Sequence, residues 1–227
     1  MSAPAPNPEL LRSLGRLVRG LSALFWGLPL ALIVCVQAAR SAWLQAFSIL
    51  PPLAVTGLLL FGLWQMDTFQ QQERPWRAAL DRAKLIALIN LGLSPFVFWW
   101  SRMPEEPLFT TALGILSVSA VLFLSNVNLV LRRLGAMLPD ETLRHETRQF
   151  TVLNRGLLTL LLLLAGLRLC LAQLANRPSL LSWILIWLDK AGLWLVTLLV
   201  LFPLALTMAL LWKTKEVILD SVFNRTP

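Results

Sequence analysis

The sequence has little of the residue types that carry most enzyme chemistry. It contains no tyrosine, one histidine and two cysteines among 227 residues. Cys35 and Cys170 are too few for a disulfide framework and lack the Cys-x-x-Cys spacing of redox or metal sites. Gly-rich phosphate loops and the Gly-x-Ser-x-Gly turn are also missing. We therefore expect a protein that is not an enzyme and that needs no metal or other cofactor.

The single histidine begins a near match to a zinc-protease motif. The string from His145 to Gln149 starts like His-Glu-x-x-His, in which two histidines one helical turn apart bind zinc and the glutamate acts as base. Gln149 stands where the second histidine is required, and the chain contains no other. We interpret the string as part of a solvated cytoplasmic helix.

Charge is scarce, and apolar residues come in long runs. Charged residues are 14% of the chain, hydrophobic residues are 57%, and the mean hydropathy is +0.69. The apolar runs are about 20 residues long, which matches a hydrocarbon core of about 30 Å at 1.5 Å per helical residue. The sequence predicts an all-α integral membrane bundle of six transmembrane helices in one domain, spanning about 17–39, 47–66, 83–101, 109–131, 156–176 and 191–212.

The positive charge indicates orientation and not nucleic-acid binding. The formal net charge is +8, but the basic residues stand in small groups between the apolar runs and form no single patch. Of the 20 Lys and Arg residues, fifteen fall on the side of the two termini and four on the other. By the positive-inside rule both termini are cytoplasmic. Because arginine outnumbers lysine, as in GC-rich bacteria, we expect a bacterial cytoplasmic (inner) membrane.

Two segments leave alternatives open. The first run follows a leader with Arg12, Arg16 and Arg19 and is longer than the usual apolar core of a signal peptide, so we interpret it as an uncleaved anchor and keep cleavage near Ala38 as the alternative. The segment 178–190 is too short to span alone. It is either an interfacial helix or the outer extension of the sixth span.

Proline and tryptophan add local predictions. Pro95 should kink the third span near Leu91 and Gly92. Tryptophan prefers the membrane interface, and we expect Trp26 and Trp194 to be packing residues instead. The tryptophans near predicted span ends are Trp43, Trp64, Trp99, Trp100, Trp183, Trp187 and Trp212.

Polar residues inside the predicted spans form one candidate site. A charge within a span costs at least about 2.5 kcal/mol, so Arg168 either pairs with Asp189, snorkels outward or binds an anion. The other members are Asn90, Ser94, Asn126 and Asn128. Such residues form interhelical hydrogen bonds or, beside the Pro95 kink, line a small polar cavity. The small residues Gly114, Ser117 and Ala120 predict a close helix approach.

A second candidate site lies on the cytoplasmic side. Residues 140–155 predict an amphipathic helix, with Leu143, Phe150, Leu153 and Leu157 roughly along one face. The arginines nearby are candidate contacts to anionic lipids or to a partner protein: Arg132, Arg133, Arg144, Arg148 and Arg155. Alternatively, this helix packs beneath the bundle and leads into the fifth span.

These patterns favour a non-catalytic membrane component, that is, an accessory subunit, scaffold or assembly factor. It would bind lipids, membrane protein partners or a second copy of itself. The alternative is a small transporter or channel with a polar site between spans three, four and five. A membrane enzyme is the third hypothesis, and no residue set in the sequence nominates a catalytic centre.

Overall fold

The computed structural model of the chain consists of helices and the turns that join them. It describes the backbone of residues 8–40, 47–70, 72–137, 141–174 and 180–223. Side chains are described in the same stretches except at residues 8, 10–11, 142–143, 168–174, 180–196 and 221–223. These stretches contain no strand, so the predicted all-α class is confirmed for them.

The helices are long, and their order follows the apolar runs. They are α1 (Pro8–Arg40), α3 (Leu50–Gln65), the short 3-10 helix η1 (Met66–Thr68), α4 (Arg74–Leu93), α5 (Phe96–Arg102), α6 (Pro107–Met137), α7 (Glu141–Leu174) and α8 (Leu180–Phe223).

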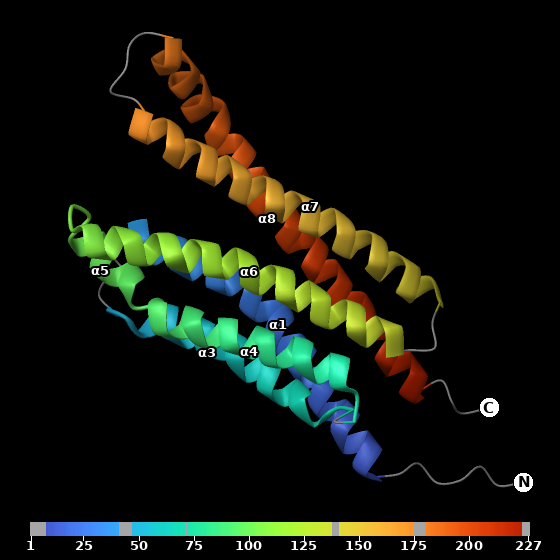
Figure 1. The fold of residues 1–227 in the computed structure, drawn as a ribbon. Helices are drawn as coiled ribbons and strands as arrows, with labels where there is room; N and C mark the ends of the chain where they lie inside the picture. Colours follow the sequence, from blue (N-terminus) through green and yellow to red (C-terminus); the bar gives the residue numbers. More distant parts are fainter. Residues whose placement is uncertain (1–7, 41–46, 71, 138–140, 175–179, 224–227) are drawn as a thin grey trace, which may run out of the picture.

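Helices that follow one another in sequence pack side by side, and the last packs against the first. α3 contacts α1 and α4, α6 contacts α4 and α7, and α8 contacts both α7 and α1 (Figure 1). The short α5 packs against α1 and α6. The chain is therefore an up-and-down bundle closed by the contact between α1 and α8.

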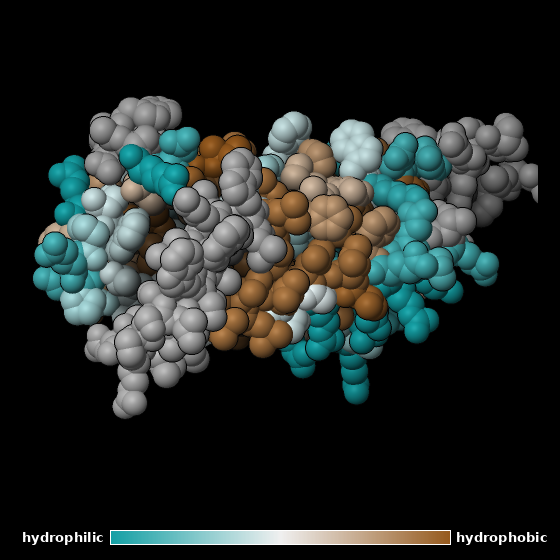
Figure 2. Space-filling view, turned by 90° about the horizontal axis from the view of Figure 1, so that it is seen from above, coloured by the Kyte–Doolittle hydropathy of each residue, from teal (hydrophilic) through white to brown (hydrophobic). Residues whose placement is uncertain are grey.

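The distribution of polar and apolar side chains is that of a membrane protein. Five helical stretches are long and apolar enough to cross a bilayer: Arg12–Arg40, Arg74–Arg102, Pro107–Met137, Arg144–Leu167 and Thr197–Asp220. Large apolar side chains on their surfaces are exposed, such as Leu88, Ile115 and Leu163, whereas Asn128 and Thr207 are buried. Figure 2 shows hydrophobic residues across the middle of one face and hydrophilic residues toward both ends. Hydrocarbon is the solvent that suits such a surface.

The second predicted span, 47–66, forms a shorter helix than expected. α3 has 16 residues, or about 24 Å at 1.5 Å per residue, less than the hydrocarbon thickness of about 30 Å. It is not among the five stretches long enough to span. Pro51 and Pro52 occupy its first turn, where a missing N–H costs little.

Both termini lie at the same end of the bundle, together with the α3–α4 turn and the α6–α7 connection (Figure 1). We call this the basic end, because Arg16, Arg74, Arg133 and Lys213 lie on the helix segments that meet there. The opposite end carries α5 and the α5–α6 turn. The positions of the helix ends thus follow the alternation of sides that the charge pattern predicts.

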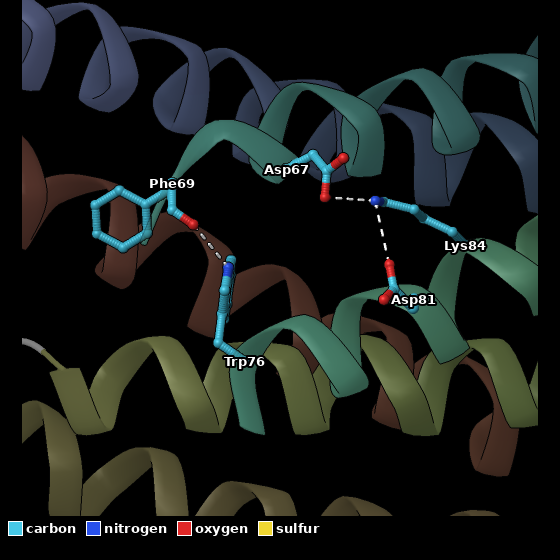
Figure 3. Close-up of polar contacts among 5 residues, drawn as sticks. All are labelled: Asp67, Phe69, Trp76, Asp81 and Lys84. Carbon is cyan, nitrogen blue, oxygen red and sulfur yellow. Dashed lines mark hydrogen bonds and ion pairs between the residues drawn. The ribbon is translucent and has the colours of Figure 1, made fainter. Parts of the chain in front are cut away.

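The tightest packing lies toward the basic end. The largest fully buried side chains come from α1, α3, η1, α4, α6 and α8: Leu17, Leu21, Leu24, Leu63, Met66, Trp76, Leu80, Leu131, Leu134, Leu210 and Leu211. Trp76 anchors the α3–α4 turn, because its indole N–H donates to the carbonyl of Phe69 at 3.0 Å and its ring meets the Phe69 ring edge-on (Figure 3). A smaller cluster of Ala38, Val97 and Leu116 lies nearer the opposite end.

Three local expectations need correction. The third span breaks at Ser94 and Pro95, not near Leu91 and Gly92, since α4 ends at Leu93 and α5 begins at Phe96. Trp26 is 63% exposed, so it faces outward and is not an interior packing residue. The three small residues Gly114, Ser117 and Ala120 are all exposed and join no close helix approach.

Two segments that we predict from the sequence as separate from the spans, 140–155 and 178–190, are continuous with α7 and α8. α8 runs unbroken from Leu180 to Phe223, so the helix of the sixth span extends back through most of 178–190. α7 likewise runs unbroken from Glu141 to Leu174. Near the basic end it buries Thr147, Thr151 and Asn154. Of the predicted apolar face, Phe150 is partly buried against the core, whereas Leu153 is 48% exposed.

Candidate functional site

Two of the predicted polar residues lie at the break between α4 and α5. Pro95 has no N–H, which leaves the carbonyl of Leu91 without its helical donor. The Ser94 hydroxyl replaces that donor and lies 2.9 Å from the Leu91 oxygen. Thr56 of α3 also approaches the Ser94 oxygen, at 3.3 Å. Ser94 therefore satisfies the carbonyl that the break leaves free and connects α4 to α3.

Asn90 lies one turn before this break. Its side chain is buried, and its side-chain oxygen has no hydrogen-bond partner within the described part of the chain. A buried polar atom without a partner is costly in an apolar interior. Asn90 thus places one unsatisfied oxygen in the interior of the bundle.

Asn128 belongs to a different cluster, at the meeting of α6, α7 and α8. Its amide N–H donates to the Thr207 hydroxyl oxygen at 2.9 Å, and Asn154 of α7 donates to the same oxygen at 3.0 Å. Thr207 donates in turn to the carbonyl of Pro203 at 2.8 Å. We call Asn128, Asn154 and Thr207 the three-helix polar cluster. All three side chains are almost fully buried.

Asn126 also lies at the α6–α7 interface. Its amide N–H caps the Leu122 carbonyl of its own helix at 2.8 Å, and its side chain lines a cavity between α6 and α7. Asn90 does not line that cavity. Asn128 also lines this cavity, so the polar residues of spans three and four are divided between the region of the α4–α5 break and the α6–α7 interface. The predicted members Arg168 and Asp189 have side chains outside the described residues.

The α6–α7 cavity brings together two of the predicted arginines. It has a volume of about 270 Å³ and lies where α6 nears the basic end. Arg132 of α6 and Arg155 of α7 line it, and both are exposed. The remaining walls mix polar and apolar side chains: Ser125, Asn126, Asn128, Leu129, Thr151, Val152 and Leu158. We call this the Arg132–Arg155 cavity.

The α6–α7 hairpin is tied together around this cavity. The Arg144 guanidinium donates to the carbonyl of Ala136 at 3.4 Å, which joins the start of α7 to the end of α6. A side chain at Gly135 would meet the Thr147 hydroxyl at 3.2 Å, so glycine permits this close approach. Arg133 and Arg148 are exposed and do not line the cavity.

The residues of the incomplete zinc motif have other partners. His145 and Gln149 share a hydrogen bond of 2.9 Å along α7. Glu146 forms an ion pair with Lys213 of α8 and so joins these two helices at the basic end. Among the residues that the structure describes, no three His, Cys, Asp or Glu side chains come together.

Three residues that form these contacts were not predicted as site residues from the sequence: Asn154, Thr207 and Thr56. Asn154 falls within the predicted amphipathic helix 140–155, where the sequence pattern singles out the apolar residues and the arginines. A usable signal existed at Thr207, which follows Pro203 by four residues and can therefore bond back to its carbonyl. The partners across helices had no sequence signal.

Comparison with known proteins gives no family for the chain. No protein-family model, curated protein or solved structure matches it.

Proposed function

We propose that the chain is a non-catalytic, multi-pass component of a cell membrane that binds anionic lipid headgroups at its cytoplasmic face. It crosses the bilayer six times, with α3 as the second crossing and both termini in the cytoplasm. The cell membrane is that of a bacterium. The proposal also includes binding to a membrane protein partner or to a second copy of the chain.

The observation that carries the lipid proposal is the Arg132–Arg155 cavity. Arg132 follows the predicted fourth span and Arg155 precedes the fifth, so both guanidinium groups belong to the cytoplasmic boundary of the bilayer. Phosphate is a preferred partner of guanidinium, whose rigid fork of donors fits two phosphate oxygens. Leu129, Val152 and Leu158 give the same cavity an apolar wall suited to the adjoining glycerol and acyl carbons.

The polar residues of the bundle support a binding role over transport. A transport path needs its polar groups on one continuous cavity, whereas Ser94 lies at the α4–α5 break and, of these three residues, Asn126 and Asn128 line the α6–α7 cavity. Ser94 and Asn128 are also engaged in hydrogen bonds that join helices or repair a helix break. These contacts favour a structural use of the buried polar side chains.

The lipid proposal is tested by native mass spectrometry of the detergent-purified full chain with phosphatidylglycerol and phosphatidylcholine. We expect preferential phosphatidylglycerol adducts that fall about tenfold in Arg132→Gln/Arg155→Gln, because charge-assisted hydrogen bonds are lost. The matched control is Arg133→Gln/Arg148→Gln, which removes the same charge from exposed positions outside the cavity. An equal loss in the control would contradict a specific site, as would equal binding of both lipids by the wild type.

A further inference from the structure

A second arginine-lined cavity lies between α1 and α3, also at the basic end. Its volume is about 360 Å³. Its walls come from three elements: Arg16 and Arg19 of α1, Phe61, Trp64 and Gln65 of α3, and Thr68 of η1. We call it the Arg16–Arg19 pocket. None of these residues belongs to either candidate site of the sequence analysis.

The pocket lies beside a close approach of α1 and α3. A Cβ atom at Gly20 would lie 2.6 Å from the carbonyl oxygen of Gly62, and one at Gly62 would lie 3.1 Å from that of Gly20. The backbones of α1 and α3 therefore touch at this point. Arg16 and Arg19 lie within the preceding turn of α1, so the contact places them beside the end of α3.

The polar groups of the pocket are free to receive an anion. Within the described stretches neither Arg16 nor Arg19 forms an ion pair or a hydrogen bond through its side chain. The nearby carboxylate of Asp67 is engaged elsewhere, because Lys84 of α4 holds it at 2.6 Å (Figure 3). Two uncompensated guanidinium groups give the pocket a positive potential.

Thr68 gives an independent indication of a ligand. Its hydroxyl oxygen is buried and has no hydrogen-bond partner among the described residues, although it lines the pocket. A hydroxyl in that state costs free energy unless another group bonds it. A phosphate oxygen between Arg16 and Arg19 would accept a hydrogen bond from the Thr68 hydroxyl.

The apolar half of the pocket selects an amphiphile over a free anion. Phe61 is 49% exposed and Trp64 is 63% exposed, and their spacing of three places them on one side of α3. They precede Gln65 and Thr68, so the aromatic side chains lie toward the middle of the bilayer and the polar groups toward the basic end. Exposed aromatic rings at this depth suit the boundary between headgroups and hydrocarbon.

We propose that the Arg16–Arg19 pocket binds the phosphodiester of an anionic phospholipid from the cytoplasmic leaflet. Arg16, Arg19 and Thr68 donate to the phosphate oxygens, and Phe61 and Trp64 contact the glycerol and the first acyl carbons. The site is separate from the Arg132–Arg155 cavity. It rests on the proposed function only in taking the basic end as the cytoplasmic side of the membrane.

The test is photo-crosslinking of the full chain in phosphatidylcholine nanodiscs that contain a minority of diazirine-labelled phosphatidylglycerol. Peptide mass spectrometry then locates the adducts. We expect adducts on the peptide containing Phe61 and Trp64, reduced about tenfold in Arg16→Gln/Arg19→Gln. The control Arg12→Gln removes one α1 charge that lies outside the pocket and should retain the adducts. Thr68→Val, which keeps every charge, should reduce them by a smaller factor.

Each alternative outcome has a defined meaning. Adducts that do not change in Arg16→Gln/Arg19→Gln, or that form equally with labelled phosphatidylcholine, overturn the inference. Displacement of the label by inorganic phosphate would assign the pocket to a soluble anion and overturn the lipid assignment. In the wild-type protein, absence of adducts on α6 and α7 alone contradicts the proposed function, whereas absence of adducts on α1 and α3 alone contradicts this inference.

Discussion

At the scale of single residues, the bundle is held by polar side chains that share partners. The Thr207 hydroxyl accepts from Asn128 and Asn154 and donates to the Pro203 carbonyl, so one oxygen joins α6, α7 and α8. Interhelical hydrogen bonds in membranes contribute about 0.6–2 kcal/mol each, a modest value because the separated helices also find other hydrogen-bond partners. The three-helix polar cluster is thus a strong candidate for setting how α8 packs.

Thr207→Val tests this directly. Valine keeps the shape but removes one acceptor and one donor, so we expect a loss of about 1–3 kcal/mol in the free energy of unfolding. The measurement is thermal or denaturant unfolding of the purified protein in one detergent. Thr159→Val is the control, since the exposed Thr159 hydroxyl bonds only the Arg155 carbonyl in its own helix. Equal effects of the two changes would mean that the cluster does not stabilise the bundle.

Tryptophan provides a second contrast between residues of one type. Trp76 is 1% exposed and donates to the Phe69 carbonyl, whereas Trp64 is largely exposed. Trp76→Phe removes that hydrogen bond and leaves a void, and we expect a loss of about 1–3 kcal/mol. Trp64→Phe should change the free energy of unfolding by less than about 0.5 kcal/mol. Unfolding measurements on both variants check the order, and a larger effect at Trp64 would contradict it.

At the scale of elements, α1 and α3 are joined by glycines. An added Cβ at Gly20 meets the Gly62 carbonyl oxygen and Met66 Cγ at 2.6 and 2.7 Å, whereas one at Gly15 meets nothing within 4 Å. Alanine raises helix propensity by about 1 kcal/mol at either position. Only at Gly20 does the methyl group force two backbones apart.

We therefore expect opposite effects from two identical substitutions on α1. Gly20→Ala should lower the unfolding temperature in detergent, because the α1–α3 approach must open. Gly15→Ala should leave it unchanged or raise it slightly. A Gly20→Ala protein as stable as the wild type would show that α1 and α3 do not meet as closely as their backbones indicate.

The sequence predicts the positions of the helices better than the faces on which they pack, because the helices are surrounded by lipid and not by water. Hydropathy found the long helices because length and apolar content suffice for that. It did not find the polar residues Thr147, Thr151 and Asn154 that α7 buries, because the pattern draws attention to its apolar face, of which Phe150 packs against the core and Leu153 is exposed. In water the apolar face packs inward, but in lipid a polar face does so equally well. Likewise Gly20 and Gly62, 42 positions apart, carry no mutual signal in one sequence.

At the scale of the whole molecule, the bundle has two unequal ends. The large core, both arginine-lined cavities and the Glu146–Lys213 ion pair lie toward the basic end. A positively charged end suits a protein that holds anionic lipids or receives an acidic partner, as we propose. The number of crossings decides whether this end faces one compartment, and α3 is the helix on which that number depends.

Cysteine accessibility decides whether α3 crosses the membrane. The test introduces single cysteines into a Cys35→Ser/Cys170→Ser background. Gly15→Cys lies near the start of α1, Glu73→Cys follows α3, and Glu105→Cys follows α5. All three positions are exposed. If both α1 and α3 cross, a membrane-impermeant maleimide should label Glu105→Cys in intact cells, and the other two only after permeabilisation. If α3 does not cross, Gly15→Cys and Glu73→Cys must lie on opposite sides. The basic residues around Arg74 would then face the outside, which the fifteen-to-four distribution of Lys and Arg opposes.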